Sequence, residues 1–187
     1  MDKPFINKLD NSGYNINFLT GIYCLWGSQY TQAIEFFNNA VSETDPLEKM
    51  YSTYLSYLGL TTVLTHQKCG LHQCYQSTDT RSPTKPEILL NLACAEFISD
   101  NRRRGIQAID KFDRIESVKG SEEINSFFNI VGKRERNTKG LPKRNHFINK
   151  TLGGMFRKRE SVDKAQIKAF IRETAKSRYK GIMLNLV

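Results

Sequence analysis

Residues 16–46 read INFLTGIYCLWGSQYTQAIEFFNNAVSETDP, and this stretch decides the fold class. Apolar residues recur at helical spacing in its first half until Gly27 and Ser28 interrupt them. The same spacing returns over residues 30–41, where it forms one apolar stripe. Pro46 ends the second helix, because proline disfavours helical backbone at the residue before it. The stretch therefore predicts a helical hairpin.

The same pattern occurs twice more along the chain. Residues 47–78 contain a long apolar helix, a polar break at 66–70 and a weaker second helix. Residues 86–116 contain an apolar helix, a break at 100–101 and a second amphipathic helix. Small residues open the three second helices, at Ala33, Gly70 and Gly105. They recur 37 and 35 residues apart, close to the ~34-residue period of helical-hairpin repeats.

Two segments resemble the tetratricopeptide repeat family. In residues 29–46, the family's tyrosine, alanine, aromatic and alanine positions are held by Tyr30, Ala33, Phe37 and Ala40, and Gly21 matches the glycine of the preceding helix. In residues 88–112, matching positions are held by Leu89, Leu92, Ala93, Gly105 and Ile109. In the middle hairpin, either Leu58 or Gly59 is the glycine equivalent. The resemblance covers residues 14–117.

This resemblance implies an all-α solenoid of about three helical hairpins, with a capping helix and a basic C-terminal helical segment. The cap is predicted over residues 121–136, where apolar residues line one helical face. The predicted organisation is an N-terminal extension at 1–13, a helical repeat domain at 14–136, a basic linker with a short amphipathic piece at 137–160, and a C-terminal helix at 161–187.

Charge is distributed unevenly along the chain. The net charge is +9, and residues 133–187 hold 16 Lys/Arg against 4 Asp/Glu. This basic end could remain solvated or meet an acidic protein, a nucleic acid or an anionic membrane. Aromatic residues lie between its cations, which permits stacking on bases but also packing on the repeats. The candidate basic patch comprises Arg102, Arg103, Arg104, Lys143, Arg144, Lys150, Arg157, Lys158 and Arg159.

The sequence contains no phosphate loop, nucleophile elbow or metalloprotease motif, so we expect neither catalysis nor a cofactor. His66, Cys69, His72 and Cys74 are ligand types that suit zinc, but their spacing is not that of a zinc finger. We interpret them as residues of the hairpin neck and expect no metal. No apolar run is long enough to span a membrane, and no secretory signal begins the chain, which favours the cytoplasm and unpaired cysteines.

The resemblance implies a protein-binding scaffold, because the first helices of such repeats line a concave groove. The implied groove residues are Asn15, Phe18, Ile22, Leu25, Trp26, Glu87, Leu90, Cys94, Phe97 and Ile98. They are mostly apolar and would suit an amphipathic helix or extended peptide, as in the chaperones of bacterial secretion systems. Alternatively, the chain's own C-terminal helix covers several of them. The alternative function is nucleic-acid binding through the basic segment 133–187.

Overall fold

The computed structural model describes residues 13–67, 69–78, 85–115, 122–131 and 162–184. Within these ranges all regular structure is helical, so the predicted all-α class is confirmed. The helices are α2 (Ile16–Trp26), α3 (Tyr30–Ser42), α4 (Tyr51–Leu64), α5 (Cys69–Thr78), α6 (Pro86–Ile98), α7 (Arg102–Asp113), α8 (Glu122–Val131) and α10 (Lys164–Leu184). None of the helices in these ranges combines the length and apolar content needed to cross a bilayer.

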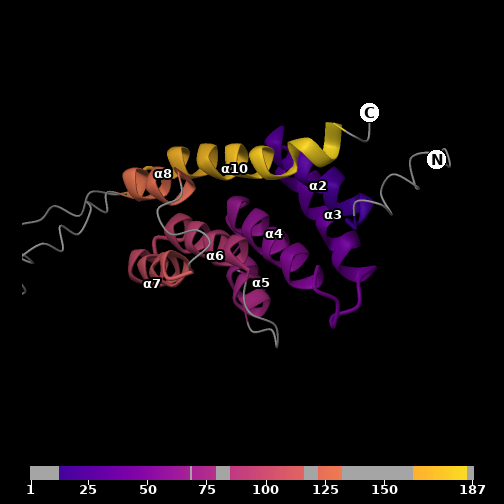
Figure 1. Cartoon of the computed structure of the whole chain (residues 1–187), viewed down its shortest axis with the longest axis horizontal. Coiled ribbons are helices and arrows are strands. Elements are labelled where there is room, and N and C mark those ends of the chain that lie inside the picture. Colours follow the sequence, from indigo (N-terminus) through magenta and orange to yellow (C-terminus); the bar gives the residue numbers. More distant parts are fainter. Residues whose placement is uncertain (1–12, 68, 79–84, 116–121, 132–161, 185–187) are drawn as a thin grey trace, which may run out of the picture.

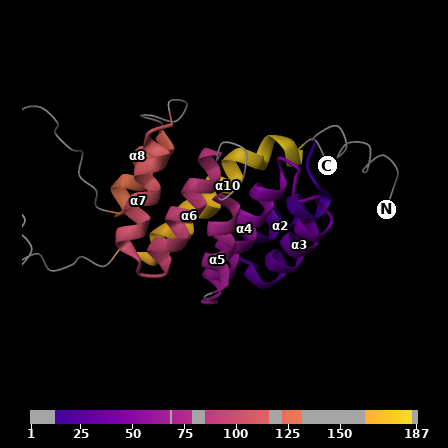
Figure 2. The same ribbon diagram turned by 90° about the horizontal axis from the view of Figure 1, so that it is seen from below.

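Three consecutive helix pairs form the body of the molecule. Helices α2 and α3, α4 and α5, and α6 and α7 pack together as hairpins. Neighbouring hairpins are joined by contacts of α3 with α4, of α5 with α6 and of α4 with α6. The hairpins lie side by side in chain order, followed by α8 (Figures 1 and 2).

The same backbone arrangement turns the chain in all three hairpins. The second residue after each first helix has a left-handed conformation, with φ of 61° to 65°, at Ser28, His66 and Asp100. The next residue then donates an N–H bond to a carbonyl near the end of that helix, which satisfies a carbonyl group that the helix end leaves unpaired. The bonds run from Gln29 to Cys24, from Gln67 to Thr62 and from Asn101 to Glu96, over 2.8–3.2 Å. The structure therefore has a turn at each predicted break, although the middle one is shorter than predicted, because Cys69 and Gly70 already belong to α5.

Helices α4 and α5 approach each other backbone to backbone. A Cβ atom added at Gly70 would lie 2.4 Å from the carbonyl oxygen of Gly59, so neither position has room for a side chain. Of the two candidates for this position, Leu58 and Gly59, it is Gly59 that lies at the crossing. In the first and third hairpins the two helices approach differently. There a glycine of one helix packs against an aromatic ring of the other, at Gly21–Phe37 and Gly105–Phe97.

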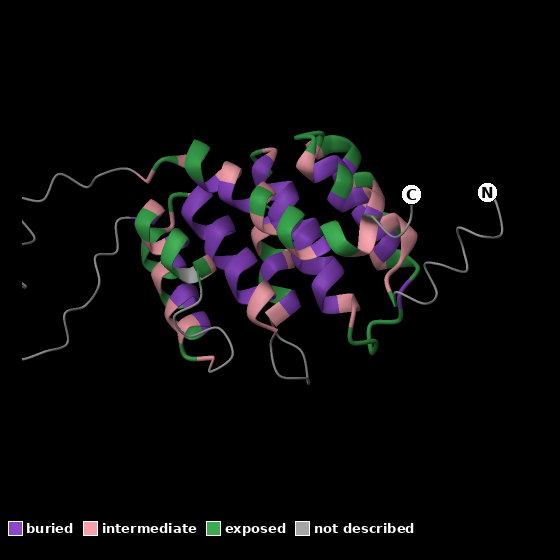
Figure 3. Ribbon diagram, turned by 45° about the horizontal axis from the view of Figure 1, so that its top comes forward, coloured by how far each residue is buried: buried purple, intermediate pink, exposed green. Residues whose placement is uncertain are grey.

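The core is centred on α4 and α6, which are buried on nearly all sides (Figure 3). Helix α4 is buried around its circumference because other helices enclose it. The hydroxyl groups of Ser56, Thr61 and Thr62 donate to carbonyls of their own helix over 2.7–2.8 Å. Buried polar groups in α4 are thereby satisfied without water.

Some predicted boundaries were wrong. The last helix was predicted from residue 161, but it begins at Lys164 and extends to Leu184, where Ile182 and Met183 still pack against the core. Its first turn is capped by Asp163, whose Oδ1 accepts the N–H of Ala165 over 2.8 Å. Helix α4 begins only at Tyr51, since the preceding residues form turns. The predicted linker 137–160, Ser161 and residues 1–12 lie outside the described ranges.

Candidate functional site

Helix α10 crosses one face of the hairpin array (Figures 1 and 2). It packs against α2, α6 and α8, and its Tyr179 reaches Tyr57 of α4. The face is therefore built from the first helices of the three hairpins together with α8. We call the surface of α2, α4, α6 and α8 that contacts α10 the α10 seat.

An apolar stripe attaches α10 to this seat. Five residues at helical spacing are at most 9% exposed: Ile167, Phe170, Ile171, Ala175 and Tyr179. Phe170 packs on Phe127 of α8 with ring centroids 5.3 Å apart, and Phe127 in turn packs on Phe97 of α6. Ala165, in the first turn of α10, is exposed. Burial of such a stripe is the main favourable term for seating an amphipathic helix.

Tyr179 enters an aromatic part of the seat. Its ring meets those of Tyr14, Phe18 and Tyr57 edge to face, at centroid distances of 5.6, 5.3 and 6.0 Å. Edge-to-face contacts of this kind are favourable for aromatic pairs. The Tyr179 hydroxyl donates a 2.5 Å hydrogen bond to Oε1 of Glu87, in the first turn of α6. Tyr179 is thus held by its ring and by its hydroxyl.

Arg178, the preceding residue, meets two carboxylates. Its Nη2 lies 2.6 Å from Oε1 of Glu123, and its Nη1 lies 3.6 Å from Oε1 of Glu87. Both glutamates are in the first turns of their helices, where the helix dipole favours negative charge. Nη1 makes no hydrogen bond within the described part of the chain. The site therefore places one guanidinium between two carboxylates.

Burial and charge shift the pKa values of these groups. Burial raises the pKa of Tyr179 far above its ordinary value of 10.0, and Tyr57 and Glu87 raise it further. Burial likewise raises the pKa of Tyr57, with Glu87 adding to the effect. Burial alone would lower the pKa of the Arg178 guanidinium, but Tyr57, Glu87 and Glu123 raise it. At neutral pH the site holds protonated tyrosines and a charged arginine.

Two exposed contacts attach α10 to the hairpin turns. Lys164 pairs with Asp100 over 2.7 Å, and Arg172 donates to Oγ of Ser28 over 2.7 Å. Asp100 and Ser28 are the left-handed residues that close the third and first hairpins. Exposed ion pairs contribute only about 0–1 kcal/mol, so these contacts orient α10 more than they hold it.

Most of the predicted groove residues are buried and are not open to solvent. Seven are at most 4% exposed: Phe18, Ile22, Leu25, Leu90, Cys94, Phe97 and Ile98. Phe18 and Glu87 contact α10 directly, through Tyr179. The sequence analysis also offered the alternative that the C-terminal helix covers several of these residues. In the structure α10 packs on α2 and α6, the helices that carry them.

Asn15 and Trp26 lie at the two ends of α2. Asn15 is the N-cap, since its Oδ1 accepts the N–H of Asn17 over 2.7 Å. Trp26 is half-buried and lines a depression beside α10, together with Tyr23, Arg172 and Lys176. Asn15 thus has a structural role, and Trp26 is at the edge of the seat.

Three residues of the predicted basic patch open α7. Arg102, Arg103 and Arg104 are exposed in its first turn. The nearby Asp100 pairs with Lys164 of α10. Arg102 instead donates over 3.0 Å to the carbonyl of Val131, at the negative end of α8. The other six patch residues, Lys143, Arg144, Lys150, Arg157, Lys158 and Arg159, lie outside the described ranges.

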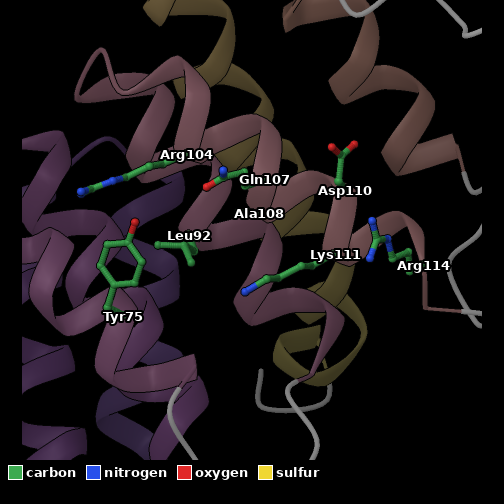
Figure 4. Close-up of a pocket in the computed structure, with 8 residues that line it drawn as sticks. All are labelled: Tyr75, Leu92, Arg104, Gln107, Ala108, Asp110, Lys111 and Arg114. Carbon is green, nitrogen blue, oxygen red and sulfur yellow. The ribbon is translucent and has the colours of Figure 1, made fainter.

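A second basic feature is a pocket between α5 and α7, away from α10 (Figures 1 and 4). It has a volume of about 290 Å³ and is lined by Tyr75, Leu92, Arg104, Gln107, Ala108, Asp110, Lys111 and Arg114. The Tyr75 hydroxyl donates to Glu96 of α6, a carboxylate with no exposed surface. Burial and this contact raise the pKa of Tyr75 to about 12. The tyrosine hydroxyl thus connects the wall of this pocket to the buried carboxyl group of Glu96.

Sequence reasoning missed three charged residues that the structure buries or half-buries: Arg178 and Glu123 at the α10 seat, and Glu96 in contact with Tyr75 of α5. Arg178, Glu123 and Glu96 were not candidates, because a charged residue in a helical pattern is ordinarily solvent-exposed. A weak signal existed at Tyr179, which continues the stripe of Phe170, Ile171 and Ala175 at helical spacing. Glu96 also stands out as the one charged residue between Ile88 and Ile98.

The His/Cys group is dispersed in the structure. Cys74 is buried and donates to the carbonyl of Ser56, and burial raises the pKa of its thiol. His66, Cys69 and His72 are exposed. In the described ranges, no three His, Cys, Asp or Glu side chains are grouped so as to hold a metal ion. Comparisons of the chain with protein-family models, curated proteins and solved structures give no match.

Proposed function

We propose that this chain is a protein-interaction scaffold, a short tetratricopeptide-like solenoid that holds an amphipathic helix of another protein. The binding surface is the α10 seat. In the closed form α10 occupies it, and a client helix replaces α10 when it binds. The observation that carries this proposal is the amphipathic helix already seated across the first helices of all three hairpins.

The contacts of α10 resemble those of a bound helix. An amphipathic helix in a groove is recognised by apolar anchors at helical spacing, and α10 supplies five. Its polar contacts sit at the rim and at one buried point, Arg178 with Glu87 and Glu123. The seat thus combines an apolar centre with a few placed polar groups, as protein-binding surfaces do.

Covalent attachment makes α10 a strong competitor. Residues 132–161 connect it to α8, so the seat experiences an effective α10 concentration on the order of millimolar. A client must overcome this concentration through higher affinity or through an event that weakens α10. The apolar seat would then be covered at all times, by α10 in the closed form and by the client helix in the bound form.

A cleavage experiment tests the proposal. A protease site is inserted between residues 131 and 162, so that the purified full chain can be cut without removing α10. After cleavage, a fluorescent peptide of residues 162–187 should exchange with the native fragment, saturably and one to one, while the uncut chain should bind far less of it. If the cut chain never exchanges its fragment, or loses its helical circular dichroism signal, α10 is a permanent part of the core and the proposal fails.

The alternative function, nucleic-acid binding through residues 133–187, has less support in the described residues. Lys164, Arg172 and Arg178 of α10 already have protein partners, whereas Lys176 and Lys180 are exposed. Tight RNA or DNA binding by the intact chain, with a steep loss of affinity as salt rises, would favour this alternative.

A further inference from the structure

The α10 seat consists of two chemically different parts. Around Phe170 of α10 it is apolar, where that ring meets Phe127 of α8. Around Arg178 and Tyr179 it offers three aromatic rings, from α2 and the turn before it and from α4, and two carboxylates, from the first turns of α6 and α8. We call this second part the acid–aromatic socket, and it comprises Tyr14, Phe18, Tyr57, Glu87 and Glu123.

The carboxylates of the socket require a cation from any helix that fills it. The side chains of Glu87 and Glu123 are only 18% and 26% exposed when α10 is seated. A helix without a cation there would leave two carboxylates close together and largely removed from water, which is strongly unfavourable. An arginine is better suited than a lysine, because its planar guanidinium can meet both carboxylates at once.

The rings of the socket require an aromatic residue with a hydroxyl. Tyr179 is 2% exposed and donates to Glu87. A phenylalanine would fill the same space but would leave a Glu87 oxygen without its donor, and an aliphatic residue would lose the ring contacts. The adjacent Arg178 reaches Glu123 of α8 over 2.6 Å.

We infer that the client of this scaffold is a basic amphipathic helix that carries an arginine followed by a tyrosine, in the place of Arg178 and Tyr179. This inference rests on the proposed function and names the class of partner. Acidic helices and purely apolar helices are excluded by the socket, even where their apolar stripe matches that of α10. The client therefore shares with α10 a local chemical motif as well as its amphipathic character.

Labelled peptides test the inference against the full chain. The chain carries Arg178→Ala, which weakens its own α10 while leaving the seat unchanged. Four fluorescent peptides of residues 162–187 are compared: the native sequence, Arg178→Ala, Tyr179→Phe and Lys176→Ala. The Lys176→Ala peptide is the matched control, because it loses one positive charge at an exposed position of the same helix.

The native and Lys176→Ala peptides should bind with similar affinity. The Arg178→Ala peptide should bind at least about tenfold more weakly, since it leaves the socket carboxylates unpaired. The Tyr179→Phe peptide should bind about fivefold more weakly, through loss of one buried hydrogen bond. Glu123→Gln in the chain should reduce the difference between the native and Arg178→Ala peptides, because the two residues contact each other.

The outcomes separate the two proposals. If the native peptide does not bind at all, the scaffold function itself fails. If the native and Arg178→Ala peptides bind equally, the seat accepts any amphipathic helix and the inference about the client is wrong. Should the Arg178→Ala chain lose its helical signal, the same ranking is measured by competition on the cleaved native chain.

Discussion

The left-handed residues at the hairpin turns illustrate how single positions combine two roles. Ser28 and Asp100 each close a hairpin and also contact α10, through Arg172 and Lys164. His66 closes the middle hairpin, and its side chain is exposed. A side chain in this conformation is strained, and at Ser28 and Asp100 the polar side-chain atoms make these contacts with α10 in addition to closing the turn.

Replacing His66 by glycine should therefore stabilise the protein. Glycine adopts the left-handed conformation without a Cβ penalty, and we expect a gain of up to about 1 kcal/mol in the free energy of unfolding, measured in urea. Asp100→Gly is the matched control, because it relieves the same strain but loses the contact with Lys164. A loss of stability in His66→Gly would show that the turn needs the imidazole.

Gly70→Ala should have the opposite effect. The new Cβ would meet the backbone of Gly59 and Val63, which cannot move aside as a flexible side chain would. We expect a loss of about 1–3 kcal/mol, as for other overpacked positions. Gly181→Ala is the control, because nothing lies within 4 Å of its Cβ position and the change should stabilise α10 by about 0.5–1 kcal/mol. Equal melting temperatures would contradict the close approach of α4 and α5.

At the scale of elements, the start of α2 is tied to the end of α3. Asn15 caps α2, and the side-chain amides of Asn15 and Asn17 both donate to the carboxylate of Glu43 over 2.9–3.0 Å. The backbone N–H of Asn15 also donates to the hydroxyl of Tyr54. One asparagine thus connects three helices at the edge of the first hairpin.

Asn15→Ala should lower the free energy of unfolding by about 1 kcal/mol through loss of the cap. The bonds from Asn15 and Asn17 lower the pKa of Glu43 below its ordinary 4.5. Their contribution is therefore present above that pH and is lost as the pH falls through the lowered pKa. Urea unfolding from pH 7 to acid should show a smaller acid loss in Asn15→Ala than in the native chain. Asn15→Ser, which retains a capping oxygen, should recover most of the stability at neutral pH.

At the scale of the whole molecule, α10 packs across the first and third hairpins and α8 and so covers one face of the hairpin array. Its contacts extend from Asp100 and α8 to Ser28 and α2. Two buried tyrosines, Tyr179 of α10 and Tyr57 of α4, make the stability of this closed form depend on pH. Because burial raises the pKa of Tyr179 and Tyr57 in the folded chain, the protonated forms contribute stability that is complete below pH 10 and is lost above it.

The closed form should therefore weaken as the pH rises above about 10. Urea midpoints followed by circular dichroism, together with tyrosinate absorbance, should show the loss of stability accompanying ionisation. Tyr179→Phe should reduce this alkaline sensitivity, because it removes one of the buried hydroxyls. Tyr23→Phe is the control, since Tyr23 is 61% exposed, and it should leave the pH dependence unchanged. Identical alkaline profiles for all three chains would contradict a role for Tyr179.

The helices and the breaks between them could be read from the residues, because apolar periodicity and turn preferences are properties of neighbouring positions. The spacing of the small residues could also be read from the sequence, and all three, Ala33, Gly70 and Gly105, are buried in the structure. The same holds for the prediction of a separate basic helix at the C-terminal end. Each of these features depends on residues within one hairpin or one helix.

The position of that last helix depended on tertiary structure. Tyr179 meets Glu87 at a separation of 92 residues, and Arg178 meets Glu123 at a separation of 55. No local pattern links such distant residues, and a charged side chain in a helix reads as exposed until its partner is known. Apolar periodicity could show that α10 had a face to bury, but only the packing of the hairpins into one array placed the rings and carboxylates together beneath it.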